Sequence, residues 1–386
     1  MYRVALKMLV GDRAKYFGIV MGITFASLLI TQQSSIFTGL MTRTYGFIGD
    51  TGLPDIWVMD PKVQFIDDIK PLQDTEVFRV RSIAGVEWAV PLYKGLVKAR
   101  LQNGRFQTVN LVGLDDATLI GGPPTMVEGT LADLRRSDAV IVDEVGAKGK
   151  LAKPGPTPDA PKTPIGVGDT LELNDHRAVV VGICKVSRTF QSQPMVYTTY
   201  SRATTFAPRE RKLLSFVLVK ARPGEDIQAM KARIERVTGL AAYTKQEFKD
   251  LTYDYFMKNT GIPVNFGIAV VLGFIVGTAI AGQTFFNFTQ DNLKHFGTLK
   301  AMGASNRTLL LMILLQALTV GVIGYGVGVG AAALLGYATR GSELAFRMPG
   351  YLLALSGGAV TIICLFSALL SIRTVMKLEP AIVFKG

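Results

Sequence analysis

The sequence of 386 residues predicts an α-helical membrane protein with four transmembrane helices and a large α+β extracytoplasmic domain inserted between helices 1 and 2. Three observations predict this fold class. Four stretches without a charged residue each exceed the roughly 20 residues that a helix needs to cross a bilayer. A mean hydropathy of +0.31 is typical of a membrane protein that also has a water-soluble part. A long, charge-rich segment separates the first stretch from the other three.

The charge-free stretches predict the membrane helices, and the charged segments between them predict the other parts. The first helix is long and no clear cleavage site follows its core, so we interpret it as a retained anchor. In chain order we expect a cytoplasmic interfacial helix at 1–15, transmembrane helix 1 at 16–42, an extracytoplasmic domain at 43–258, transmembrane helix 2 at 262–288, a cytoplasmic coupling segment at 289–307, transmembrane helices 3 and 4 at 308–338 and 350–372, and a cytoplasmic tail at 373–386.

The distribution of basic residues predicts the orientation. Outside 43–258, most lysines and arginines fall within 3–15, 294–307 and 373–385. The positive-inside rule places all three segments, and therefore both termini, in the cytoplasm. The basic excess thus reflects topology, with some attraction to the anionic headgroups of membrane lipid, and does not predict nucleic-acid binding.

The extracytoplasmic domain predicts mixed α and β structure. We divide it into a membrane-proximal βα part, at about 43–89 and 213–258, and a mostly-β inserted part at about 90–212. Asn103-Gly104 predicts a hairpin turn, and the proline-rich segment 153–164 predicts an exposed loop. Runs of strand-forming residues predict strands at 55–59, 96–101, 106–112, 139–142, 177–184 and 215–220, and periodic apolar residues predict helices at 71–83 and 225–237.

Small residues recur at four-residue spacing in the first two membrane helices, a pattern that lets helix backbones approach closely in lipid. It predicts a packing face between these helices or between two subunits. The alternative is that glycine and alanine are simply common in membrane helices. The residues are Gly18, Gly22 and Ala26 in the first helix and Gly273, Gly277 and Ala281 in the second.

The most informative local motif is the run FGTLKAMGAS at 296–305, between two membrane helices on the predicted cytoplasmic side. Phe296, Leu299 and Met302 recur at three-residue spacing, and small residues between them leave little bulk. The pattern predicts a short, semi-apolar helix that is exposed to a cytoplasmic partner. An ordinary interfacial elbow is the alternative, and periodicity alone favours it.

This run resembles the coupling segment of the FtsX/MacB-type permeases, the type VII ABC transporters. The segment LEPA at 378–381 is similar to that family's carboxy-terminal proline signature. Residues 5–17, 55–61 and 88–95 resemble the DevC branch, whose permeases are separate subunits. The resemblance covers essentially the whole chain, including the order of the membrane helices.

The resemblance implies an inner-membrane permease subunit with a periplasmic domain. It implies four partners: an ABC ATPase subunit, a second permease copy, a periplasmic adaptor and a TolC-like outer-membrane channel. The conformational change of the ATPase would then drive efflux or export. Two alternatives remain open: a mechanotransmitter that regulates a cell-wall hydrolase or senses a ligand, and a lipoprotein-releasing subunit.

The resemblance also implies roles for the coupling segment. Phe296, Leu299 and Met302 would insert into a groove of the ATPase, and Lys300 would pair with its acidic rim. The small residues Gly297, Gly303 and Ala304 would allow the close approach.

Several residue patterns argue against catalysis on this chain. The segment 146–150 (GAKGK), followed by Leu151, lacks the spacing and the hydroxyl of a phosphate-binding loop. We therefore expect no cofactor here, with ATP and Mg²⁺ bound by the separate ATPase. His176 and His295 are the only histidines and fall on opposite predicted sides, so no metal site is expected.

The four predicted membrane helices contain no Asp, Glu, Lys, Arg or His, so they lack the groups of a proton or ion relay. Their polarity is limited to side chains such as Gln283, Asn287, Gln316 and Thr319. We expect these to form interhelical hydrogen bonds.

Overall fold

The computed structural model describes residues 2–101, 103–155, 160–208 and 213–376 and divides into two compact units. The first, here called the membrane unit, comprises Met1–Leu40 and Gly261–Gly386. The second, the sheet unit, comprises Met41–Thr260. The LEPA signature, most of the predicted tail at 373–386 and the centre of the predicted loop 153–164 lie outside the described residues.

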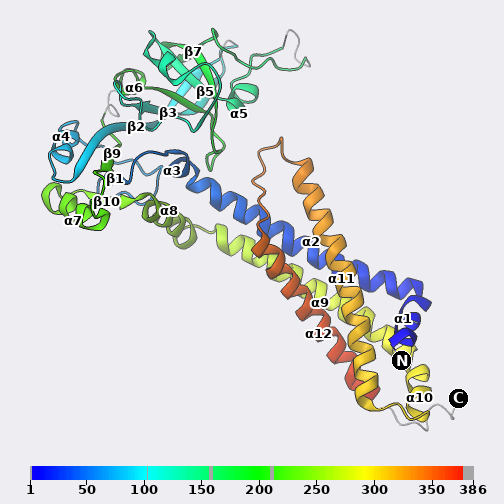
Figure 1. Cartoon of the computed structure of the whole chain (residues 1–386). Helices are drawn as coiled ribbons and strands as arrows, with labels where there is room; N and C mark the ends of the chain where they lie inside the picture. The colour runs from blue at the N-terminus through cyan, green and yellow to red at the C-terminus, as the bar shows by residue number, and fades with distance from the viewer. Residues whose placement is uncertain (1, 102, 156–159, 209–212, 377–386) are drawn as a thin grey trace. The chain divides into compact units, whose positions relative to one another are not determined.

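The membrane unit is a helical bundle in which α2, α9, α11 and α12 lie side by side (Figure 1). Each of the four is long and apolar enough to cross a membrane. Together with the sheet unit that follows α2, they confirm the predicted fold class. The helices that lie wholly or mostly in this unit are α1 (Tyr2–Gly11), α2 (Arg13–Thr44), α9 (Ile262–Asp291), α10 (Leu293–Ala301), α11 (Asn306–Ala338) and α12 (Gly350–Met376).

The helix expected over 1–15 ends at Gly11 because Asp12 begins the next one. The Asp12 carboxylate accepts a hydrogen bond from the Lys15 backbone N–H at 3.2 Å, as expected of a residue that caps a helix N-terminus. Ala5 and Leu9 of α1 are fully buried in the core of the bundle. The Gln316 amide of α11 donates to the Ala5 carbonyl at 2.8 Å, which holds α1 against α11.

The sheet unit is built on a mixed sheet with the strand order β10-β1-β9-β2-β3-β8-β5-β7-β4, with β6 pairing with β2 and β7, counted over the described residues. The strands are β1 (Ile56–Met59), β2 (Val86–Arg100), β3 (Phe106–Leu114), β4 (Thr125–Glu128), β5 (Ala139–Asp143), β6 (Thr170–Leu173), β7 (His176–Lys185), β8 (Met195–Thr199), β9 (Phe216–Ala221) and β10 (Ala241–Thr244). The helices are α3 (Gly46–Asp50), α4 (Thr75–Arg81), α5 (Glu144–Lys148), α6 (Tyr200–Phe206), α7 (Ile227–Thr238) and α8 (Lys245–Asn259), with a short 3₁₀ helix at Leu131–Arg135.

The long strand β2 joins the two parts of the sheet unit. Its first half, up to Leu92, pairs with β9, and its second half, from Tyr93, pairs with β3. The change of partner falls close to residue 90, where the sequence predicts the start of the inserted part. The β2–β3 turn is closed by the Leu101 N–H, which donates to the Arg105 carbonyl at 2.8 Å.

Alternating side chains of β1 bury both faces of the membrane-proximal part of the sheet. Ile56 and Val58 pack in the cluster that contains residues of α4 and α7. Trp57 packs in the opposite cluster, with its ring centroid 5.5 Å from that of Phe248 of α8 and 6.2 Å from that of Phe47 of α3. Because strand side chains alternate between faces, this short, fully buried strand holds helices on both of its sides.

Candidate functional site

The coupling segment forms α10, and its end is fixed by Gly303. The Gly303 N–H donates to the Lys300 carbonyl at 3.1 Å and the Ala304 N–H donates to the Leu299 carbonyl at 3.0 Å. Gly303 has φ +95°, the left-handed conformation that terminates many helices and that only glycine adopts without strain. Gly303 therefore ends the helix, and the close approach of a partner that the resemblance implies for it stays a prediction.

Burial revises the expectation that Phe296, Leu299 and Met302 all insert into a partner. Phe296 is 0% exposed and Leu299 is 9% exposed, both within the core cluster of the membrane unit. Met302, just beyond the last helical residue, is 70% exposed. The helix packs its Phe296 face back against the bundle, so the apolar group that it offers outward is Met302.

The other predicted coupling residues also differ in how far they are buried. Gly297 is buried, and Ala304 packs at the edge of the core. Lys300 is half-buried and interacts within the chain, and its pairing with a partner's acidic rim stays a prediction. Within residues 293–304 of the segment, the exposed residues are Lys294, His295, Thr298, Ala301, Met302 and Gly303.

The six small residues predicted to pack lie along an antiparallel contact between α2 and α9, where some face one another and others face larger side chains. A Cβ atom on Gly22 would lie 2.7 Å from Cγ2 of Ile280, and one on Gly277 would overlap the Ala26 methyl. Further along, a Cβ on Gly273 would lie 3.1 Å from Cβ of Leu29. Gly18 and Ala281 lie on the same seam. These separations are too short for a larger side chain, so the two backbones approach as closely as the spacing predicts.

Contacts beyond the glycines extend the α2–α9 pair in both directions. Lys15 at the start of α2 forms ion pairs with Asp12 and with Asp291 at the end of α9. Toward the other end, the rings of Phe37 and Phe266 lie 5.6 Å apart between centroids.

A second close contact joins α2 to α11, at residues that are not among the six predicted to pack. A Cβ on Gly324 would lie 2.7 Å from Cγ2 of Ile23, and one on Gly328 would lie 2.6 Å from Cβ of Ser27. The four-residue spacing of these glycines is the signal that could have identified it. Of the four polar residues expected to bond between helices, only Gln316 does so; Gln283 contacts Asn287, and Thr319 bonds to the Leu315 carbonyl, both within their own helices.

In the sheet unit, the elements that adjoin the membrane helices in sequence are bonded to each other. The Lys245 ammonium at the start of α8 donates to the carbonyls of Gly49, at 2.7 Å, and Thr51, at 3.0 Å. A cation is favourable at the C-terminal end of a helix, here α3. Burial lowers the pKa of Lys245. The sequence offered no signal for this contact, because the partners are far apart in the chain.

The inserted part of the sheet unit is also hydrogen-bonded to the end of α3. The Asp50 carboxylate, at the end of α3, accepts hydrogen bonds from the N–H of Ser187 at 2.6 Å and from its hydroxyl at 2.8 Å. Ser187 lies between β7 and β8. We call this arrangement of Asp50, Lys245 and Ser187 the α3 junction, because it joins α3 to both parts of the sheet unit.

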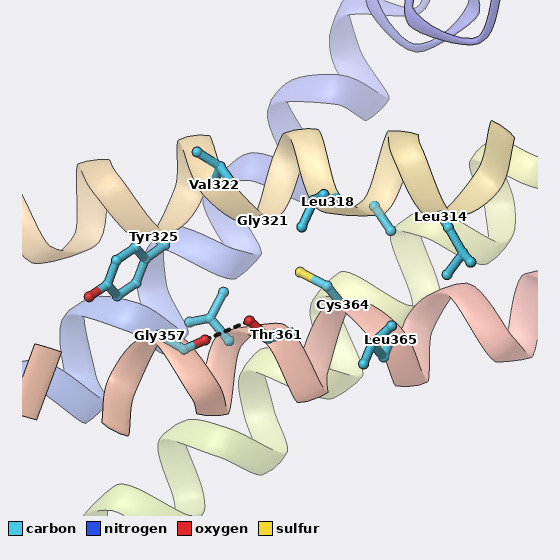
Figure 2. Close-up of a pocket in the computed structure, with 11 residues that line it drawn as sticks. Leu314, Leu318, Gly321, Val322, Tyr325, Gly357, Thr361, Cys364 and Leu365 are labelled. Atoms are coloured by element: carbon cyan, nitrogen blue, oxygen red, sulfur yellow. Dashed lines mark hydrogen bonds between the residues drawn. The ribbon is translucent and has the colours of Figure 1, made fainter. Parts of the chain in front are cut away.

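A groove of about 260 Å³ lies between α11 and α12 (Figure 2). Its two hydroxyl groups are bonded to backbone: Tyr325 donates to the Leu353 carbonyl at 2.7 Å and Thr361 to the Gly357 carbonyl at 2.8 Å. The remaining lining is apolar and includes Leu318 and Cys364. The groove therefore presents an apolar surface and no charged group to whatever occupies it.

Within the described ranges, no group of three or more His, Cys, Asp or Glu residues has the geometry of a metal site. Cys184 and Cys364 are both buried and unpaired. Burial raises the pKa of the Cys184 thiol, and such a thiol is a poor nucleophile.

These features define a class: a polytopic membrane protein whose first crossing helix is followed by a large mixed-sheet domain. Comparison with known families identifies it further. Residues 16–237 match the MacB-like periplasmic core domain and residues 267–380 match the FtsX-like permease C-terminal domain. The chain belongs to the FtsX/MacB-type ABC transporter permeases, and membership implies that an ATPase works with it.

Its relatives have the same general description. An uncharacterised ABC transporter permease of Mycobacterium tuberculosis is 25% identical over 318 residues, covering 82% of this chain and 80% of that one. One from Methanocaldococcus jannaschii is 25% identical over 237 residues, covering 58% of each. Among solved structures, the periplasmic region of MacB from Actinobacillus actinomycetemcomitans aligns with 55% of this chain and 96% of that one, with 17% identity and a TM-score of 0.37.

Proposed function

We propose that this permease transmits the conformational change of a separate ATPase subunit to its sheet unit, and that this movement drives efflux or export. In this proposal both termini and α10 are cytoplasmic, the membrane is the inner membrane and the sheet unit is periplasmic. A second permease copy, a periplasmic adaptor and a TolC-like channel complete the assembly. ATP and Mg²⁺ are bound by the ATPase, and this chain carries no cofactor.

The observation that carries the proposal is the pairing of the two chain segments that run between the units. Within the membrane unit, α2 and α9 are in contact from Lys15–Asp291 through Ala26–Gly277 to Phe37–Phe266. Within the sheet unit, α3 follows α2, α8 precedes α9, and Lys245 bonds α8 to α3. Segments that are packed together along their length move together, because close-packed interiors transmit displacement.

The cytoplasmic end of this pair adjoins α10. Phe296 and Leu299 fix α10 to the core of the membrane unit, while Met302 is left exposed. A force that an ATPase applies at Met302 would therefore act on the end of α9 and on the start of α11. Burial of Phe296 in the membrane unit supports this role better than insertion of Phe296 into the ATPase would, because a helix that is held rigidly transmits force.

Affinity purification of the tagged full-length chain from its native membranes tests the proposal. Recovery of an ATPase, an adaptor and a TolC-like channel supports export. Recovery of an ATPase and a cell-wall hydrolase would instead support the mechanotransmitter alternative. Depletion that leaves lipoproteins in the inner membrane would support lipoprotein release.

A further inference from the structure

An open cavity of about 790 Å³ lies in the membrane unit where α1 and α2 meet the junction of α9 and α10. Lys7 and Arg13 line it on one side, and Asp291, Asn292 and His295 line it on the other. The coupling role described above uses Asp291 of this lining, through its ion pair with Lys15, but assigns no role to Lys7 or Arg13. It lies at the end of α2 and α9 where basic residues gather, at the predicted level of the lipid headgroups.

The charges of this cavity favour a monovalent anion. Lys15 forms ion pairs with both carboxylates of the site, Asp12 and Asp291. Among the residues that the structure describes, neither Lys7 nor Arg13 forms an ion pair, and both are exposed. Three cations and two carboxylates leave one net positive charge, which matches the single negative charge of a phosphodiester.

An apolar track on α2 begins at the same cavity. Phe17 and Met21 are each 62% exposed and Phe25 is 42% exposed, and with Arg13 they follow one another at four-residue spacing. Residues four apart lie on one face of a helix. At a rise of 1.5 Å per residue, the track from Arg13 to Phe25 is about 18 Å long. A cation at one end of a long apolar track is complementary to an anionic headgroup attached to an acyl chain.

We propose that this cavity binds an anionic membrane phospholipid, with the phosphate between Lys7 and Arg13 and one acyl chain along Phe17, Met21 and Phe25. The bound lipid would join α1 and α2 to α9 and α10, next to the coupling segment. The lipid content of the membrane would thereby influence how firmly α10 is held. This inference rests on the proposed function only for the cytoplasmic placement of the cavity.

The test uses the full-length permease without its ATPase, so failure of the coupling proposal would not affect the result. Native mass spectrometry measures the retention of phosphatidylglycerol and of phosphatidylcholine. We expect selective retention of phosphatidylglycerol, weakened about tenfold or more in the double variant Lys7→Gln/Arg13→Gln. The matched control Lys294→Gln/Arg307→Gln removes the same charge from exposed residues outside the cavity and should bind like the unaltered chain. The charge-conserving variant Lys7→Arg/Arg13→Lys should retain phosphatidylglycerol like the unaltered chain.

Three kinds of result would overturn the proposal. The first is a lack of selectivity: equal retention of the two lipids by the unaltered chain, or an equal loss of phosphatidylglycerol in the control variant. The second is displacement of phosphatidylglycerol by millimolar glycerol phosphate or inorganic phosphate, which would identify a site for soluble phosphate. The third is efficient disulfide crosslinking of Met21→Cys to its counterpart in native membranes, which would show that a second copy of the chain covers the apolar track. Unchanged thermal stability of the variants in phosphatidylcholine confirms that they are folded.

Discussion

Ala26 of α2 and Gly277 of α9 lie in direct contact, so closely that a Cβ atom on Gly277 would overlap the Ala26 methyl. The contact is the centre of the α2–α9 pair, whose two helices lead into α3 and out of α8 in the sheet unit. A side chain larger than hydrogen at position 277 must push the two helices apart.

We expect Gly277→Leu to separate α2 from α9, to destabilise the permease by about 1–3 kcal/mol and to reduce its stimulation of the partner ATPase. Thermal unfolding in detergent and ATPase assays of the reconstituted complex measure the two effects. Gly267→Leu is the control, because it lies on the same helix and a Cβ there would meet no atom within 4 Å. Equal effects of the two substitutions would argue against the α2–α9 contact.

Alanine substitutions of Met302 and Phe296 should affect different properties: ATPase stimulation for Met302 and thermal stability for Phe296. Met302→Ala removes an exposed side chain, so it should leave the thermal stability unchanged and lower ATPase stimulation. Phe296→Ala empties a fully buried site and should cost about 3–5 kcal/mol of stability. Met376→Ala, which truncates another exposed methionine on α12, should change neither property. Normal stimulation by the Met302 variant would remove its assigned role.

The α3 junction should weaken when Lys245 is replaced. Lys245→Met loses two charge-assisted hydrogen bonds to the carbonyls at the end of α3, which we expect to cost about 1–2 kcal/mol. Hydrogen–deuterium exchange should become faster in α3. Lys258→Met, at an exposed position of the same helix, should leave exchange in α3 unchanged. Unchanged protection of the α3 amides from exchange in Lys245→Met would contradict the role of Lys245 in the α3 junction.

Acid should weaken the start of α8 through Glu247. Burial acts to raise the pKa of this carboxyl, but the ammonium of Lys231 and the N–H and hydroxyl of Thr244 outweigh it and lower the pKa to about 2. The stabilisation is therefore present above the ordinary pKa of 4.5 and is lost as the pH falls toward 2. More than a third of the Glu247 side chain faces water, so we expect only about 1 kcal/mol.

Thermal unfolding between pH 6 and pH 3 measures this contribution. Glu247→Gln should lower stability at pH 6 and have a smaller effect at pH 3. Asp254→Asn, at an exposed position of α8, should show no comparable difference. A Glu247→Gln effect of the same size at both pH values would exclude the proposed linkage.

Features with a short sequence period could be predicted. Charge-free length predicts the four membrane helices, and four-residue spacing of Gly22, Ala26, Gly273 and Gly277 predicts small faces that meet. The hairpin follows from its Asn103-Gly104 turn. In each case the residues that determine the feature are neighbours in the chain, so the pattern can be read without knowing the fold.

Features that depend on distant contacts could not be predicted in this way. The pattern of Phe296, Leu299 and Met302 gives their spacing but not whether the helix faces solvent or the bundle, and the structure buries the first two. The bonds from Lys245 to Gly49 and from Ser187 to Asp50 each join residues more than a hundred positions apart. The charged run 12–15 predicts a boundary between the first two helices but not its position, which the Asp12 cap places three residues before the predicted end at residue 15.

Hydrogen–deuterium exchange of α3 in the reconstituted permease–ATPase complex tests the central claim most directly. The comparison is between the nucleotide-free complex and one held with ATP by a hydrolysis-deficient ATPase. We expect ATP to change exchange in α3, Gly277→Leu to abolish the change and Gly267→Leu to preserve it. Exchange in α3 that is the same with and without ATP would contradict transmission from the ATPase to the sheet unit.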